Sequence, residues 1–221
     1  MSSLVTSLGL GLPLKLAADF SVIPSIYIMK RNQRHFEMFI GILHVVVSVC
    51  FNVAEISSDK TLFLPSNQWH NMLEVLWVAF LYLLSVHLLV IPSENVCIAL
   101  RYTGFALAWI MKLKDGPQVH THSLLLVAVA FSGVVLRRLV FRSPKMLPLA
   151  RTEACIAVML AAFCTCMYFY HPLFSLDPTY VRSLFYVCLG GFFFAGWKCV
   201  PSPELTAKKF DDCDIVFSNY S

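Results

Sequence analysis

A small set of polar side chains interrupts the long apolar stretches of this chain, and these side chains are the candidates for chemistry. They are Asp19, Asn52, His70, Asn71, Glu74 and Arg182. Carboxylates and imidazoles transfer protons and bind metals, whereas amides and guanidinium groups bind polar ligands. Polar groups at membrane depth are costly and usually face protein or water. We therefore expect these residues to line an inner cavity, and we assign no catalytic or metal-binding residue among them.

Glu74 needs a partner, because an unpaired carboxylate inside an apolar stretch is costly. His70 precedes Glu74 by four residues, which places both on one face of a helix. The alternative is a carboxylate at the helix end, near the lipid headgroups. The same spacing separates Lys15 from Asp19, so these two charges are expected to neutralise each other in part. Further candidate partners of Glu74 are Lys15, Arg101 and Arg182.

The recognisable motifs for metal or nucleophile chemistry are weak. His120-Thr-His122 brings two imidazoles together but has no third or fourth ligand nearby, so we interpret it as a solvated loop pair. Arg182 begins an apolar stretch, where it either extends to the membrane interface or pairs with Asp177. The chain contains no G-x-S-x-G, H-E-x-x-H, Walker or Gly-rich nucleotide-binding motif. The sequence therefore predicts no cofactor.

The composition indicates that these residues sit in a membrane protein. Of 221 residues, 58% are hydrophobic and 14% are charged, whereas soluble domains carry about 25% charged residues. One globular core of this size would not hide so much apolar surface, so the lipid bilayer is the expected partner. The formal charge of +4 is modest, and the positive residues cluster between apolar stretches, which argues against nucleic-acid binding.

The apolar stretches predict an all-α fold, a bundle of seven transmembrane helices. The stretch that organises the chain is 69–91, whose length as a helix is about 34 Å, enough to cross a bilayer core of about 30 Å. We expect the other stretches to pack around it. One membrane domain over 1–200 and a short tail over 201–221 follow. The predicted spans are 4–29, 36–54, 69–91, 95–111, 123–141, 152–170 and 180–200.

Loop charge predicts the orientation of these spans. Positively charged residues favour cytoplasmic loops. With the amino end outside, the outer loops hold only Lys60, Lys112 and Lys114. The cytoplasmic loops and tail would hold Lys30, Arg31, Arg34, Arg137, Arg138, Arg142, Lys145, Arg151, Lys198, Lys208 and Lys209. We therefore predict a multi-pass protein with its amino end outside or lumenal and its carboxyl end cytoplasmic.

Several segments, in order, resemble the myomaker family of seven-span membrane proteins. They are Val22–Ile26 followed by Lys30-Arg31, then Phe36–Met38, Cys50–Asn52, His70–Glu74 and Asp177–Ser183. The resemblance covers about residues 15 to 200. That family includes a GPI-cleaving phospholipase A2 and belongs to the CREST superfamily, together with alkaline ceramidases and adiponectin-receptor-like proteins. The resemblance implies a seven-span fold and, for the hydrolases, a membrane-embedded zinc bound by three histidines, with an aspartate and a serine assisting.

The residues that would carry this zinc chemistry are replaced here. The resemblance places the family's serine near Asp19 and its second-span histidine near Phe51 or Asn52. It places the family's aspartate on Asn71 and its paired histidines on Arg182 and Tyr186. Phenylalanine and arginine do not bind zinc, and asparagine is no carboxylate base. The resemblance thus implies a divergent, non-catalytic member without a metal.

Three functions remain open from the sequence. The first is a non-catalytic myomaker-like protein that acts through membrane, lipid and protein-partner interactions, with a lipid in its cavity. The second is a metal-dependent lipid hydrolase with a rebuilt site that uses His44, His70 or His87. The third is a small-solute transporter with Asp19, Glu74 and Arg101 along its path. No inverted repeat, which is typical of many transporters, is visible.

Overall fold

A computed structural model describes residues 13–57, 63–115, 121–140, 151–170 and 178–200. Its regular secondary structure in these ranges is helical, with short turns between the helices. Residues 13–20 form a first helical segment, which precedes the labelled helices. These are α2 (Ile23–Arg31), α3 (His35–Ser57), α4 (Ser66–Leu88), α5 (Glu94–Asp115), α6 (Thr121–Val140), α7 (Arg151–Tyr170) and α8 (Pro178–Lys198). No strand occurs in these ranges. The prediction of an all-α bundle is confirmed.

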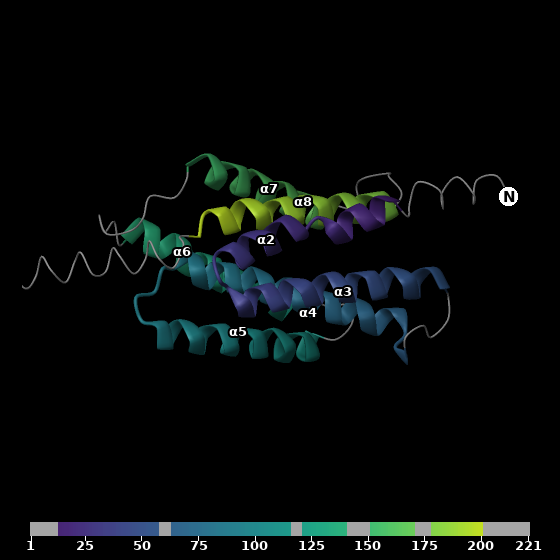
Figure 1. Cartoon of the computed structure of the whole chain (residues 1–221), viewed down its shortest axis with the longest axis horizontal. Helices are drawn as coiled ribbons and strands as arrows, with labels where there is room; N and C mark the ends of the chain where they lie inside the picture. The colour runs from purple at the N-terminus through teal and green to yellow at the C-terminus, as the bar shows by residue number, and fades with distance from the viewer. Residues whose placement is uncertain (1–12, 58–62, 116–120, 141–150, 171–177, 201–221) are drawn as a thin grey trace, which may run out of the picture.

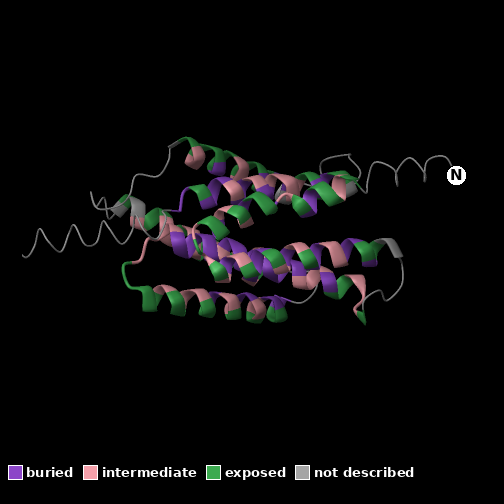
Figure 2. Cartoon of the chain, in the orientation of Figure 1, coloured by how far each residue is buried: buried purple, intermediate pink, exposed green. Residues whose placement is uncertain are grey.

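The helices run roughly parallel to the long axis of the molecule and alternate in direction (Figure 1). Helix α4 contacts α3, α5, α6 and α8, while α8 also packs on α2 and α7. In the most apolar stretch of each helix, 83% of α4 residues are buried, against 17% in α5. Figure 2 shows the same contrast between a buried α4 and an exposed outer face of α5. The prediction that the third apolar stretch forms the centre of the bundle is therefore confirmed.

The helix boundaries differ modestly from the predicted spans. Helix α4 begins at Ser66 after Pro65 and ends at Leu88 rather than at 91. It ends there because Val90 adopts a positive φ of 48°, which stops a helix of L-residues. The first stretch is interrupted at residues 21–22, and Pro24 stands in the first turn of α2, where a proline is well tolerated. Residues 4–12 lie outside the described part.

Among the described residues, three helices are long and apolar enough to cross a membrane. They cover His35–Glu55, Ser66–Leu88 and Glu94–Asp115, and Thr121–Arg137 and Thr152–Met167 are shorter apolar helices. Large side chains such as Leu113, Met159 and Leu139 are more than two-thirds exposed. Such outward apolar surface is suited to lipid contact. The number of seven crossings and the single domain over 1–200 stay predictions.

Candidate functional site, a polar cavity between the first helical segment, α3 and α8

The floor of a polar cavity is a hydrogen-bonded group formed by Asp19, Ser48 and Asn52. All three are buried. The Ser48 hydroxyl donates to one Asp19 oxygen, and Asn52 Nδ2 donates to the other at 2.6 Å. Ser48 and Asn52 are four residues apart on α3, so they present their side chains on one helix face. The floor therefore presents a carboxylate that two neutral donors orient.

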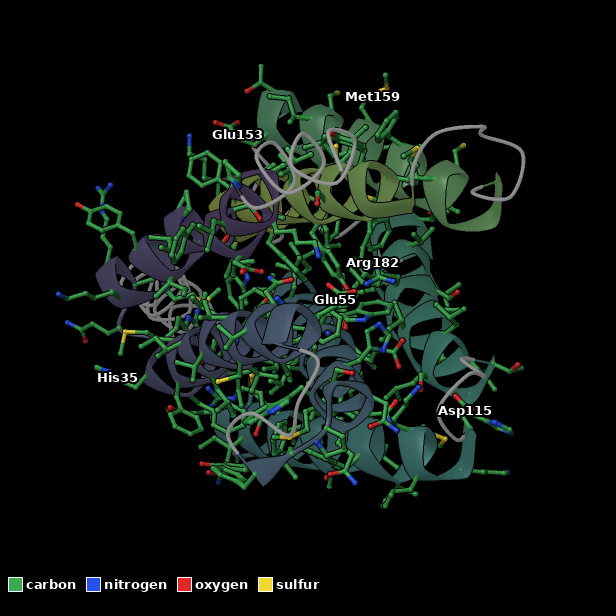
Figure 3. The ribbon with its side chains drawn as sticks, turned by 90° about the vertical axis from the view of Figure 1, so that its right-hand side faces the viewer. His35, Glu55, Asp115, Glu153, Met159 and Arg182 are labelled. Atoms are coloured by element: carbon green, nitrogen blue, oxygen red, sulfur yellow. The ribbon has the colours of Figure 1, made fainter. Side chains whose placement is uncertain are left out.

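The rim of the cavity is an ion-pair bridge centred on Glu55. Lys15 Nζ lies 2.7 Å from one Glu55 oxygen, and Arg182 Nη1 lies 3.2 Å from the other. Figure 3 looks onto this end of the bundle and shows Glu55 and Arg182 facing each other between α3 and α8. Glu55 and Arg182 are 36% and 46% exposed. This bridge joins three helical segments across the mouth and remains accessible from outside.

Helical spacing explains why charge lies at the rim and other polar groups lie deeper. Lys15 and Asp19 are four residues apart on the first segment, as Arg182 and Tyr186 are on α8, so each second residue lies about one turn below the first. Apolar and small side chains complete the wall, and the cavity has a volume of about 190 Å³. Its remaining lining residues are Ala18, Phe51, Leu73, Ser183 and Tyr186.

The structure brings together three of the six predicted cavity residues, Asp19, Asn52 and Arg182. The other three lie beside the cavity without lining it. His70 packs its ring 5.3 Å from that of Phe51 and lies 3.6 Å from Glu74. Asn71 lies on the first turns of α4 and is half-buried.

Several predicted partners are corrected by the structure. Glu74 pairs with Lys112 of α5 in addition to His70, because the last turn of α5 lies beside the start of α4. Lys15 forms its ion pair with Glu55 at the rim, while its charge also acts on Asp19 one turn away, as expected in part. Asp177, the other predicted partner of Arg182, lies outside the described residues. Sequence reasoning missed Lys112, Glu55 and Ser48 because only tertiary packing reveals which helix faces meet.

A second buried polar cluster lies at the opposite end of the bundle. Glu37 is fully buried, and its Oε1 lies 2.7 Å from His87 Nε2 and 3.1 Å from Arg101 Nη1. The His87 ring packs on Trp197, with 5.4 Å between ring centroids. This cluster ties α3, α4, α5 and α8 together. Arg101, a predicted partner of Glu74 and a predicted path residue, therefore belongs to a different end of the molecule.

The residues of the cavity do not fit the zinc that the sequence resemblance implies. Its described lining supplies two carboxylates, amide and hydroxyl groups and two cationic side chains, and no described imidazole or thiol lines it. In the described part of the chain, no group of three His, Cys, Asp or Glu side chains converges. His122 contacts Asp115 instead, while His120 lies outside the described residues. His44 is buried within α3, His70 lies beside Glu74, and His87 belongs to the Glu37 cluster at the opposite end of the bundle.

The fold and its apolar helices define a multi-pass helical protein of membrane type. Residues 12–187 match the family described as "Protein of unknown function (DUF3522)". The chain belongs to that family, since the match covers most of its length. No curated protein matched the chain in sequence.

Proposed function

We propose that this protein is an integral membrane protein that binds a membrane lipid without hydrolysing it, and that it acts through the bilayer and a protein partner. The observation that carries this proposal is the charged cavity at one end of a bundle whose outer faces are apolar. Its volume of about 190 Å³ is smaller than the roughly 300–1,000 Å³ of sites that enclose a whole drug-sized ligand. The cavity therefore suits a polar headgroup, with the rest of the molecule outside it.

An apolar groove on the other side of α8 supports a lipid as the ligand. Its volume is about 290 Å³, and residues of α4, α6, α7 and α8 line it. Phe185, in this groove, and Tyr186, in the cavity wall, are consecutive on α8. A polar site and an apolar groove thus flank one helix, in an arrangement suited to an amphipathic molecule. The groove is lined by Trp77, Leu81, Leu124, Val127, Ala128, Phe131, Ala161, Cys164, Thr165, Phe185, Leu189 and Phe192.

The residue types in the cavity support a non-catalytic role. The resemblance to the myomaker family implies histidines where Arg182 and Tyr186 stand and a carboxylate where Asn71 stands. In this chain Arg182 is engaged with Glu55, and Asn52 donates to Asp19. These groups hold one another in place and are suited to binding a polar group.

The proposed orientation places the cavity mouth at the outer side of the membrane. The ends of α2 and α8 and the start of α3 lie at the opposite end of the bundle (Figure 1). Lys30, Arg31 and Lys198 occupy the last turns of α2 and α8. Positive charge at that end favours the cytoplasm.

Lipid retention by the purified full chain tests the proposal. We expect about one lipid per chain to remain bound through detergent exchange and to be detected by native mass spectrometry. Ser183→Phe fills the cavity wall and should abolish retention, and Asn52→Leu, which disturbs its floor less, should reduce it. Ser93→Phe, at an exposed serine before α5, is the matched control. Equal retention by all variants would contradict the proposal, and so would lipid hydrolysis by the purified protein that Asn52→Leu abolishes.

A further inference from the structure

Asp19 is a buried carboxylate that forms no ion pair with any other described residue. It is 5% exposed and accepts hydrogen bonds from Ser48 and Asn52. None of the ion pairs between described residues includes it, since Lys15 one turn away is engaged with Glu55. A buried charge is costly unless it is paired. Because Asp19 lines the cavity, a positively charged ligand group would complete it.

The rim offers the opposite charge. Lys15 and Arg182 both reach the cavity from its mouth, and they share one carboxylate, Glu55. Guanidinium and ammonium groups are the side chains that bind phosphate oxygens, and arginine does so with two parallel hydrogen bonds. The lining holds two cations and two carboxylates, so its formal charge is balanced. A ligand with one positive and one negative group preserves that balance, whereas a purely anionic ligand does not.

Aromatic rings in the wall add a surface for a cationic group. Phe51 and Tyr186 both line the cavity. The Arg182 guanidinium carbon lies 5.9 Å from the centre of the Phe51 ring, so this ring already presents its face to a positive charge. Aromatic faces beside a carboxylate are the usual environment for ammonium groups, including quaternary ones. The wall around Asp19 therefore matches an alkylammonium group better than a hydroxyl or a sugar.

We propose that the cavity binds a zwitterionic headgroup, phosphocholine or phosphoethanolamine. The ammonium lies against Asp19 and the aromatic wall, and the phosphate lies against Lys15 and Arg182. This inference rests on the proposed lipid-binding function and names the class of lipid.

Short-chain lipids that share their acyl chains and differ in headgroup test the proposal on the full chain in detergent. Phosphatidylcholine and phosphatidylethanolamine should bind at least about tenfold more tightly than phosphatidylglycerol and phosphatidic acid in native mass spectrometry titrations. Asp19→Asn keeps the shape of the side chain and removes its charge, so it should abolish this preference. Glu153→Gln, at a carboxylate on α7 that does not line the cavity, should leave it unchanged.

A second pair of variants addresses the rim if Asp19→Asn does not fold. Arg182→Gln, at a half-exposed position, should weaken phosphatidylcholine binding at least about fivefold, while Lys114→Gln, at an exposed lysine of α5, should not. Equal binding of anionic and zwitterionic lipids, or an unchanged preference in folded Asp19→Asn, would overturn the headgroup assignment. Failure of every lipid to bind would instead overturn the proposed function.

Soluble phosphocholine, titrated in parallel, separates the two sources of this headgroup. Tighter binding of the lipid by at least about tenfold supports a lipid ligand. Equal affinities support the headgroup assignment but contradict the lipid-binding function, because the acyl chains would then contribute nothing.

Discussion

Gly190 of α8 sets how closely α8 approaches Ser21, in the turn after the first helical segment. Gly190→Ala should push α8 and this turn apart. A Cβ atom built at Gly190 would lie 2.5 Å from Ser21 Cβ, 2.7 Å from the Ser21 backbone carbon and closer still to the Ser21 hydroxyl. Backbone atoms do not rotate away, so the helices themselves must shift. Overpacking of this kind costs about 1–3 kcal/mol. Close helix approach through small residues is also a main source of association inside membranes.

Gly133 of α6 is the matched control, because a Cβ atom there meets no other atom within 4 Å. Both substitutions gain about 1 kcal/mol of helix propensity, so this gain cancels between them. We therefore expect Gly190→Ala to be about 1–3 kcal/mol less stable than Gly133→Ala in equilibrium unfolding by a denaturing detergent. Equal stabilities within about 0.5 kcal/mol, the usual additivity error, would refute the close packing argued here.

A double variant tests whether the clash of a Cβ atom at position 190 is with the Ser21 side chain. Ser21→Gly removes the hydroxyl and the Cβ atom but leaves the backbone carbon, so it should restore part of the stability lost in Gly190→Ala. Ser21→Gly alone loses hydrogen bonds to the carbonyl oxygens of Ala18 and Tyr186, so it is measured separately. A favourable coupling of about 0.5 kcal/mol or more is expected for residues in contact.

Three further predictions concern the rest of the bundle. Arg101→Met should cost about 2–4 kcal/mol in unfolding free energy, because it takes a cation from buried Glu37, whereas exposed Arg31→Met should change it by less than about 0.5 kcal/mol. Asp115→Ala should cost about 1–2 kcal/mol in the same measurement, because the Asp115 carboxylate accepts from the backbone N–H groups at the start of α6. Asp115→Asn keeps an acceptor oxygen and should cost less, so equal costs for the two variants would contradict this role. A glycosylation acceptor inserted at 58–62 should be glycosylated and one at 141–150 should not, as the proposed orientation requires; the reverse pattern would contradict it.

Sequence patterns predicted the architecture better than the site. The central role of α4 was predicted from its long apolar stretch together with His70, Asn71 and Glu74 at one end, which are costly to expose to lipid. Asp19 and Asn52 were recognisable because each is a polar residue inside an apolar stretch. Their mutual hydrogen bond, and the pairing of Glu74 with Lys112, depend on how the helices are rotated against each other. Glu74 and Lys112 are 38 positions apart, and no sequence periodicity indicates a contact over that distance, so their pairing required the structure.

The contact of Glu37 with His87 has a consequence for the vertical register of the helices. Apolar side chains inside a bilayer gain little from one partner over another, so apolar faces alone permit helices to slide along each other. Glu37 stands in the first turn of α3, His87 in the last turn of α4, and Arg101 fixes α5 to the same carboxylate. If α3 slipped by one turn, about 5.4 Å, against α4 and α5, the buried Glu37 carboxylate would lose both His87 and Arg101. This single acidic side chain thus sets the relative height of three helices and, through α3, the depth at which Asn52 and Glu55 stand.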